Sequence, residues 1–403
     1  MDIPVSECGS PSTYFGSLGS CASSSISEDC MRRSQVHNFS AGASAVDTEV
    51  LLKLQSQMLN FEESGMSLLE MSQRDIGGPV QRVIHEAEEN LRTLLSVPDN
   101  YKVLFMHGGA HAQFSGVPLN LLKRGSSADY ICTGLWSRKA AKEASRQIPV
   151  RELDIGVEQL NDPSSWDISE DAAYVHLCAN ETISGVAMNT DFELPGKQVL
   201  VADMTSTLIS RPIDIAKYGC IYASSGKNLG PAGVCVIIVR EDLLEFASDS
   251  IPSILSWKMQ SECQNIYNTP NHFGIWAMKE VVDQYLRHGG MDEVHSQATK
   301  KAGLLYDTVD SSNGFYTNAV PAMNRSLTAV PFHIQGGNPS LEELFIEEAA
   351  KVGIVQIFGH ASVGGLRAAI YNALPMHSVH SLVRFMRDFQ SIHEVSARHG
   401  SLT

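Results

Sequence analysis

The chain has 403 residues, of which 43% are hydrophobic and 19% are charged. This composition is typical of a globular protein with one large or two ordinary domains, and it excludes a wholly disordered or fibrous chain. The 45 Asp and Glu residues outnumber the 30 Lys and Arg residues, so the net charge is −15 at pH 7. Because no basic patch interrupts this acidity, we expect neither nucleic acid nor anionic membrane among the partners.

The cysteines and apolar runs restrict the class of protein further. The longest unbroken apolar run, residues 234–239, is far shorter than the ~20 residues that span a bilayer, and no signal peptide opens the sequence. The 8 cysteines include no C-x-x-C pair, which argues against zinc knuckles and thioredoxin chemistry, so we expect reduced thiols and no metal site. These features predict a cytoplasmic protein.

Residues 1–35 differ in composition and pattern from the rest of the chain. They are rich in Ser, Gly and Cys and have no helical or strand period, which predicts a disordered tail. An organelle transit peptide is basic and poor in acids, whereas four acidic residues precede Arg32 here. Organelle targeting is therefore the less favoured alternative.

From about residue 36 the pattern indicates helices alternating with short buried strands. One helical stripe is Leu51, Leu54, Met58 and Phe61; a second, after Pro79, is Val80, Ile84, Ala87, Leu91 and Leu94; a third, near the end, is Val379, Leu382, Val383, Met386 and Phe389. The compact apolar runs that suit buried strands are 103–106, 130–133, 174–178, 199–202, 220–223 and 234–239.

This order predicts an α/β fold with a largely parallel sheet, whose sites gather at the carboxyl ends of the strands. We expect a large domain at 36–290, with its N-terminal segment joining the small domain, and a smaller α+β domain at 291–403.

Two residues that follow neighbouring runs suggest a cofactor. Asp203 ends the run 199–202, and Lys227 comes shortly after the run 220–223. Pyridoxal phosphate chemistry needs such a pair: the Lys amine forms a Schiff base with the cofactor aldehyde, and the Asp carboxylate keeps the ring nitrogen protonated.

The surroundings of this pair favour the same chemistry. Residues 226–233 are so dense in Gly that the backbone is expected to approach a ligand closely. Residues 107–113 follow a strand and open a helix, which is typical of an anion site. Trp136 can stack on a flat ring, and Thr182 can donate to a phenolate oxygen.

Ten short segments in unbroken order, spanning about residues 36–395, resemble the phosphoserine aminotransferase family. They are NFSAG (38–42), GGA (108–110), TGLWS (133–137), NETI (180–183), DM (203–204), SRPID (210–214), KNLGPAG (227–233), YNTP (267–270), VGGLR (363–367) and IYNA (370–373). The resemblance implies a pyridoxal-phosphate-dependent transferase of fold type I, similar to aspartate aminotransferase.

The resemblance also implies roles for residues around the cofactor. Lys227, preceded by Gly226, would be the Schiff-base lysine and Asp203 the partner of the ring nitrogen, both catalytic, while Trp136 would stack on the ring and Thr182 would donate to its phenolic oxygen. Backbone N–H groups of Ala110 and His111 would bind the cofactor phosphate. Asn268 and Thr269 would reach that phosphate from the neighbouring subunit of a homodimer.

On the substrate side, the resemblance implies that Arg367 binds the substrate carboxylate and that Gln73, Arg74 and His360 lie near the substrate phosphate. Four positions depart from the family pattern. Gln73 stands where His is usual, Ala361 where Arg is usual, Gly226 where Gln is usual, and His111 where some members have Arg. The first two remove groups that would face the phosphate, a loss of about 1.5–3 kcal/mol for a charged hydrogen bond. Whether another basic side chain replaces the lost guanidinium is a question for the structure.

The function that the resemblance implies is amino transfer between glutamate and 3-phosphohydroxypyruvate in serine biosynthesis. Two alternatives remain open. Gln73 and Ala361 favour an aminotransferase whose substrate lacks the phosphate. A family member that serves only as a binding or structural protein is the other alternative, but an inert protein would not need both Asp203 and Lys227.

Overall fold

The computed structural model describes residues 28–400, with side chains up to residue 394. The chain divides into two compact units, residues 1–37 and residues 38–403. Of the tail predicted at 1–35, residues 1–27 lie outside the described range, and residues 28–34 form a helix. The predicted domain division at residue 290 stays a prediction.

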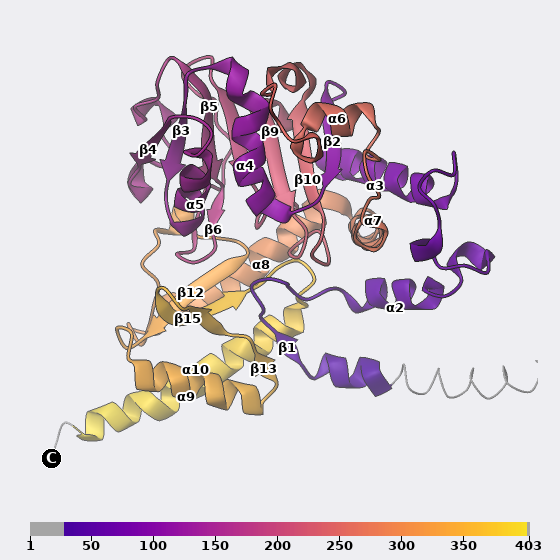
Figure 1. Cartoon of the computed structure of the whole chain (residues 1–403). Helices are drawn as coiled ribbons and strands as arrows, with labels where there is room; N and C mark the ends of the chain where they lie inside the picture. Colours follow the sequence, from indigo (N-terminus) through magenta and orange to yellow (C-terminus); the bar gives the residue numbers. More distant parts are fainter. Residues whose placement is uncertain (1–27, 401–403) are drawn as a thin grey trace, which may run out of the picture. The chain divides into compact units, whose positions relative to one another are not determined.

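The largest sheet in the second unit has seven strands (Figure 1). Within it β10 is antiparallel to both of its neighbours, and all other pairs are parallel. The predicted α/β class is confirmed. In sheet order the strands are β2 (Tyr101–Met106), β10 (Cys235–Arg240), β9 (Cys220–Ser224), β8 (Val199–Asp203), β5 (Ala172–Cys178), β3 (Ser127–Cys132) and β4 (Val150–Asp154).

Helices cover both faces of this sheet, which is why its strands are apolar on both sides. Val103 and Phe105 of β2 pack in the core shared with α3 and α7, whereas Leu104 and Met106 pack in the core shared with α4 and α5. This alternation follows from the period of two along a strand. The helices of this part are α2 (Thr48–Gln57), α3 (Pro79–Leu95), α4 (Gly109–Leu121), α5 (Leu135–Ala144), α6 (Trp257–Glu262) and α7 (His272–Arg287).

A four-stranded antiparallel sheet, backed by three helices, follows along the chain. Its strands are, in order, β11 (Tyr316–Thr317), β12 (Ala329–Ile334), β15 (Gly364–Ala369) and β14 (Phe358–His360), and its helices are α8 (Gly290–Asp310), α9 (Pro339–Lys351) and α10 (Met376–Gly400). The remaining strands are short: β1 (His37–Asn38), β6 (Asn180–Glu181), β7 (Val186–Ala187) and β13 (Ile354–Val355). Within the described residues, no helix is both long and apolar enough to cross a membrane.

Most predicted elements are present, with two corrections. The stripe predicted over Leu51, Leu54, Met58 and Phe61 is confirmed only in part: Leu54 and Phe61 are buried, but α2 ends at Gln57, and Leu51 is 36% exposed while Val50 is buried in its place. The edge strand β4 was not predicted, because its residues are mixed in polarity and none is fully buried. The stripes on α3 and α10 are confirmed, since all of their predicted residues are buried.

Phe345 provides a test of the core of the small sheet. It is fully buried, and its ring contacts Phe332, Phe385 and Phe389 at centroid distances of 4.9–5.9 Å. We expect Phe345→Ala to destabilise the protein by about 3–5 kcal/mol, because it leaves a cavity. A lowered urea-unfolding midpoint in circular dichroism is the measurement. The matched Phe358→Ala, at a side chain that is 51% exposed, should leave the midpoint nearly unchanged; equal shifts would contradict this assignment.

Candidate active site

The carboxyl ends of five strands meet at one edge of the large sheet. Register pairs Asp203 with both Cys178 and Tyr222, so β8 ends level with β5 and beside β9. β2 and β3 run in the same direction as these strands and end at the same edge. The predicted cofactor residues follow those ends: Ala110 and His111 after β2, Trp136 after β3, Thr182 after β5 and β6, Asp203 at the end of β8, and Gly226 and Lys227 after β9.

Asp203 is a buried carboxylate, 6% exposed, with a fixed orientation. Its Oδ1 accepts from the Thr205 N–H at 2.9 Å, and Thr205 Oγ1 in turn accepts from the Ser224 N–H at 3.1 Å. Burial raises the pKa of Asp203, while the bonds from Thr205 and the nearby charges of Lys227 and His111 oppose the rise. The carboxylate is therefore positioned to bind a cation or a charged N–H group.

The backbone on both sides of Lys227 is held in place. The Ser44 N–H donates to Gly226 O at 2.8 Å, and Ser44 Oγ donates to Lys227 O at 3.2 Å. Asn228 is buried and accepts at Oδ1 from the Asn372 N–H at 3.0 Å. No described residue forms a hydrogen bond or ion pair with Lys227 Nζ, so a rigid backbone carries a free amine.

Lys301 of α8 supports the turn that carries Asn372. Its Nζ is buried and donates to the carbonyl oxygens of Tyr371 at 2.8 Å and Leu374 at 3.1 Å. Burial lowers the pKa of Lys301 to about 7. The turn at 371–374 is thereby fixed between α8 and the residue that follows Lys227.

Gly226, one of the departures from the family pattern, has a local reason in its backbone. Its φ is +100°, a region that L side chains rarely adopt, and a Cβ there would approach Ala232 Cβ to 3.2 Å. Gly is the residue that this turn accommodates without strain.

Glu181 joins Trp136 and Thr182 into one rigid group. Its fully buried carboxylate accepts from the Trp136 N–H at 2.9 Å, the Ser137 N–H at 2.8 Å and Ser137 Oγ at 2.7 Å, so it caps the start of α5. Burial raises the pKa of Glu181, and these hydrogen bonds oppose the rise. Trp136 Nε1 donates to Thr182 Oγ1 at 3.2 Å, which leaves the Thr182 O–H available to donate.

The start of α4 offers open backbone donors. Its N-cap, Gly108, has no side chain to cap the helix, and the first helical hydrogen bond runs from the Ala112 N–H to Gly108 O at 3.3 Å. The N–H groups of Ala110 and His111 precede that bond. They are among the N–H groups of a first turn that binds anions.

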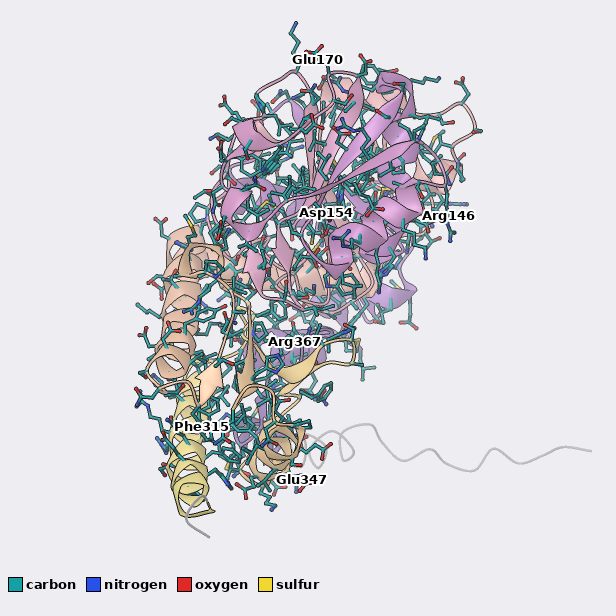
Figure 2. The ribbon with its side chains drawn as sticks, turned by 90° about the vertical axis from the view of Figure 1, so that its left-hand side faces the viewer. Arg146, Asp154, Glu170, Phe315, Glu347 and Arg367 are labelled. Atoms are coloured by element: carbon teal, nitrogen blue, oxygen red, sulfur yellow. The ribbon has the colours of Figure 1, made fainter. Side chains whose placement is uncertain are left out.

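Arg367 lies where β15 approaches the large-sheet edge, between the labelled Asp154 and Glu347 (Figure 2). It donates to Thr182 O at 3.3 Å, and its Nε is buried with no partner among the described residues. Burial lowers the pKa of Arg367, which still remains charged at neutral pH. Arg367 and His360 line a common hollow of about 140 Å³.

Gln73, Arg74, Asn268 and Thr269 form a separate group. Gln73 Nε2 donates to Thr269 Oγ1 at 3.1 Å, and Arg74, Asn268 and Thr269 are exposed. In the described chain no hydrogen bond or ion pair joins these four residues to Lys227 or Asp203.

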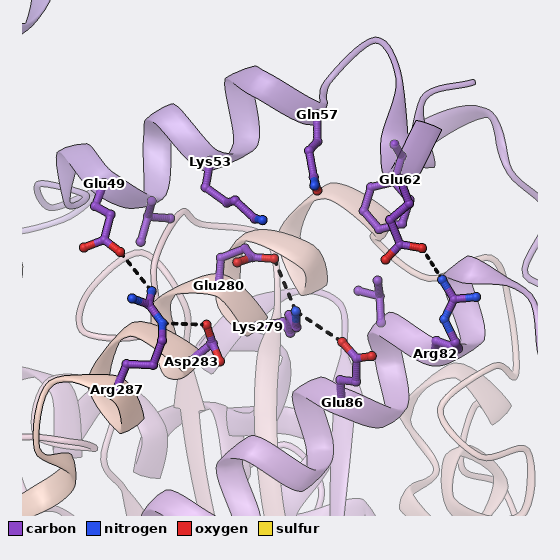
Figure 3. Close-up of a pocket in the computed structure, with 13 residues that line it drawn as sticks. Glu49, Lys53, Gln57, Glu62, Arg82, Glu86, Lys279, Glu280, Asp283 and Arg287 are labelled. Carbon is purple, nitrogen blue, oxygen red and sulfur yellow. Dashed lines mark hydrogen bonds and ion pairs between the residues drawn. The ribbon is translucent and has the colours of Figure 1, made fainter. Parts of the chain in front are cut away.

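A different hollow, of about 380 Å³, lies among α2, α3 and α7 (Figure 3). None of the predicted site residues lines it, and most of its charges pair with one another. Arg287 pairs with Glu49 and Asp283, Lys279 pairs with Glu86 and Glu280, and Arg82 pairs with Glu62. We interpret it as an ion-pair network between helices.

Comparison with known proteins identifies the family. The model of the family described as Aminotransferase class-V matches residues 36–386. The chain belongs to this family. Phosphoserine aminotransferase from Hahella chejuensis is 46% identical over 87% of this chain and 97% of its own length, and phosphoserine aminotransferase 2, chloroplastic, from Arabidopsis thaliana is 45% identical over 93% and 88%. PLP-bound phosphoserine aminotransferase from Trichomonas vaginalis is a similar solved structure, with a TM-score of 0.82, 36% identity and coverage of 87% and 99%.

The resemblance to phosphoserine aminotransferases that the ten segments indicated is therefore confirmed. Two residues of the candidate site in this class-V aminotransferase were not predicted from the sequence, Glu181 and Asn228. Both stand beside a predicted residue inside a quoted segment, NETI and KNLGPAG. Their position beside a predicted residue was the only signal in the sequence. The carboxylate that caps α5 and the amide that binds the Asn372 N–H are both buried, and their roles are recognised only from contacts in the structure.

Glu181 generates a testable prediction for this class-V aminotransferase. Glu181→Ala removes the acceptor of three hydrogen bonds, two of them from backbone N–H groups, and should cost about 1–3 kcal/mol per buried donor left unsatisfied. The urea midpoint followed by tryptophan fluorescence should fall. Glu181→Gln retains an acceptor oxygen and should lose less; a Gln variant that is as unstable as the Ala variant would contradict the capping role.

Proposed function

We propose that the protein is a pyridoxal-phosphate-dependent aminotransferase that exchanges an amino group between glutamate and 3-phosphohydroxypyruvate in serine biosynthesis. The observation that carries the proposal is the free amine of Lys227 at the same sheet edge as the buried carboxylate of Asp203. Curated relatives that align with this chain over 97% and 88% of their own length bear the name phosphoserine aminotransferase, which supports this substrate pair.

The residues present fit pyridoxal phosphate. Asp203 accepts at Oδ1 from Thr205 and, as a buried carboxylate, suits a ring N–H. The Thr182 O–H suits the phenolic oxygen, and the uncapped N–H groups at the start of α4 suit the phosphate. We propose that Trp136, held by Glu181, supplies the flat surface on which the ring stacks.

When bound, the cofactor supplies an aldehyde to hold the amino group and a ring that accepts electrons from the substrate. We propose that Lys227 Nζ would hold the cofactor covalently and that its free amine would take and return the proton of the substrate α-carbon. Asp203 keeps a proton on the ring nitrogen. Clamping of the backbone by Ser44 and Asn228 limits this movement to the lysine side chain.

Arg367 is the proposed ligand of the substrate α-carboxylate. Its guanidinium has an unpartnered buried Nε and lies against Thr182. A planar carboxylate satisfies two guanidinium N–H groups at once, so it would both neutralise the buried charge and orient the α-carbon.

We also propose that the site is completed in a homodimer by Asn268 and Thr269 of a second copy. Large apolar side chains are exposed in residues 51–76, the segment that carries Gln73 and Arg74, and in residues 267–273, the segment that carries Asn268 and Thr269. They are Leu51, Leu52, Leu59, Met66, Leu69 and Ile76 in one segment and Tyr267 and Phe273 in the other. Such a concentration of exposed apolar side chains is typical of an interface between subunits.

A second candidate function is amino transfer to a substrate that lacks the phosphate, which Gln73 and Ala361 favour. Steady-state rates with O-phospho-L-serine, L-serine and L-alanine as amino donors separate the two. A kcat/KM for O-phospho-L-serine that is no higher than the values for the other two donors would favour the second candidate.

The proposed cytoplasmic location rests on the composition, whereas the Arabidopsis relative is named chloroplastic. The location of a fluorescent fusion with and without residues 1–35 tests this proposal.

Lys227→Ala is the direct test of the proposed chemistry. Borohydride treatment of the loaded protein should attach the cofactor to the peptide that contains Lys227, as detected by mass spectrometry, and Lys227→Ala should abolish the attachment. Turnover should fall by about 10³-fold or more, because the variant loses both the nucleophile and the base. Lys300→Ala, at an exposed lysine of α8, should retain both properties. A wild-type protein that stays unlabelled and colourless with pyridoxal phosphate would refute the proposal.

Ile76→Glu tests the proposed homodimer. Ile76 is 92% exposed in the single chain, so a carboxylate there should not disturb folding but should oppose burial in an interface. Sedimentation velocity at low micromolar concentration should show a dimeric wild type and a largely monomeric variant with weaker cofactor binding. Met323→Glu, at a side chain that is 65% exposed outside these segments, should remain dimeric. A monomeric wild type with full cofactor occupancy would contradict the proposal.

A further inference from the structure

The hollow shared by Arg367 and His360 has a third basic side chain, His333. It lies between the small sheet and the residues that follow Thr182, where Ile183 and Ser184 line it. None of its lining residues, all of which belong to the described part of the chain, is acidic. A volume of about 140 Å³ holds several water molecules, so a small anionic group fits.

The strand register places His333 on the same face as Arg367. β12 and β15 are antiparallel, with Pro331 opposite Arg367. Moving two residues along each strand sets His333 opposite Gly365 on the same face of the sheet. The ring lies directly over Gly365, since a Cβ there would come within 2.7 Å of His333 Cε1. The absence of a side chain at Gly365 gives the imidazole its room.

Glu342 of α9 orients the His333 ring. Its Oε1 lies 3.0 Å from His333 Nδ1 and also accepts from the Ile334 N–H at 3.2 Å. Because an ionised carboxylate only accepts, Nδ1 carries a hydrogen and Nε2 is the atom left for a ligand. The His333 side chain is 45% exposed, and no described residue pairs with its Nε2.

His360 presents the same atom by a different local arrangement. The Ser362 N–H donates to His360 Nδ1 at 3.1 Å, so the neutral ring carries its hydrogen on Nε2. The hollow is thus lined by one guanidinium and two histidines whose Nδ1 atoms are already engaged. This arrangement suits an anion with several oxygens better than a neutral or cationic side chain.

We propose that His333, oriented by Glu342, is a substrate-binding residue that donates from Nε2 to the phosphate of the amino-acid substrate. This inference rests on the proposed function, and it adds a basic group to the hollow that His360 lines, next in the chain to Ala361, where the family has Arg. In this arrangement the ring has two N–H groups, of which Nδ1–H donates to Glu342 and Nε2–H donates to the phosphate. His333 therefore contributes to the selection of a phosphorylated substrate over its unphosphorylated analogue.

The test compares KM values for O-phospho-L-serine and L-glutamate in the holoenzyme. His333→Phe keeps a flat ring and removes the donor, and should raise the KM for O-phospho-L-serine roughly tenfold, with kcat little changed. The KM for glutamate should change no more than about twofold to threefold, because its single distal carboxylate has less charge. Inhibition of the glutamate half-reaction by inorganic phosphate should weaken in parallel. His85→Phe, at an exposed histidine of α3, should change none of these values.

A double variant separates hydrogen-bond donation by His333 from neutralisation of the Glu342 charge. His333→Phe alone also leaves Glu342 near the hollow with the Ile334 N–H but without its imidazole partner, and its charge would repel a phosphate. His333→Phe combined with Glu342→Gln removes that charge, and its KM for O-phospho-L-serine should remain several-fold above wild type. A return to the wild-type KM would show that His333 only neutralises Glu342 and would overturn the proposal.

The remaining outcomes distinguish this inference from the proposed function. A wild type that uses O-phospho-L-serine no better than L-serine contradicts the proposed function itself. A wild type that strongly prefers O-phospho-L-serine, with a His333→Phe variant of the same KM, leaves the function intact and refutes the role of His333. Since KM does not depend on the fraction of folded protein, partial unfolding of a variant does not obscure the result.

Discussion

The common direction of β2, β3, β5, β8 and β9 is the constraint on which the candidate site depends. Because their carboxyl ends meet at one edge, residues more than 100 positions apart in the chain become neighbours without any long structured loop. The edge must then be held rigid by hydrogen bonds among its polar groups. Thr205 fixes Asp203, Glu181 fixes the start of α5, and Asn228 fixes the backbone of Lys227.

The parts of the fold that could be predicted from the sequence are those governed by burial on both faces. β5, β8 and β10 are almost continuous apolar runs, since helices cover both sides of the sheet. The edge strand β4 escaped prediction because one side of it faces solvent. On α2 Leu54 was assigned to the core correctly and Leu51 wrongly, since Val50 and Leu51 both fit a helical stripe with Leu54 and only packing selects Val50.

Some residues of the candidate site could be predicted from the sequence, whereas others could not. Asp203 and Lys227 could be predicted because each follows an apolar run that indicates a strand, and because their side-chain chemistry is evident from the sequence. Glu181 and His333 were not, since each acts through a neighbour that lies far away along the chain or on another element. The Gly365 that makes room for His333 is visible as a Gly in the segment VGGLR, but the ring above it is not.

The link between Asn228 and Asn372 has a consequence for selectivity. The proposed carboxylate ligand, Arg367, stands at one end of the short segment 368–371, and the other end is pinned beside Lys227. The segment therefore fixes the distance between the group that binds the carboxylate and the reacting amine. In every α-amino acid the carboxylate and the amino group are attached to the same carbon, so this fixed distance suits all of them equally. Discrimination among amino acids must then reside in whatever contacts the rest of the substrate, and the evolution of new substrate preferences can proceed there without disturbing the reacting centre.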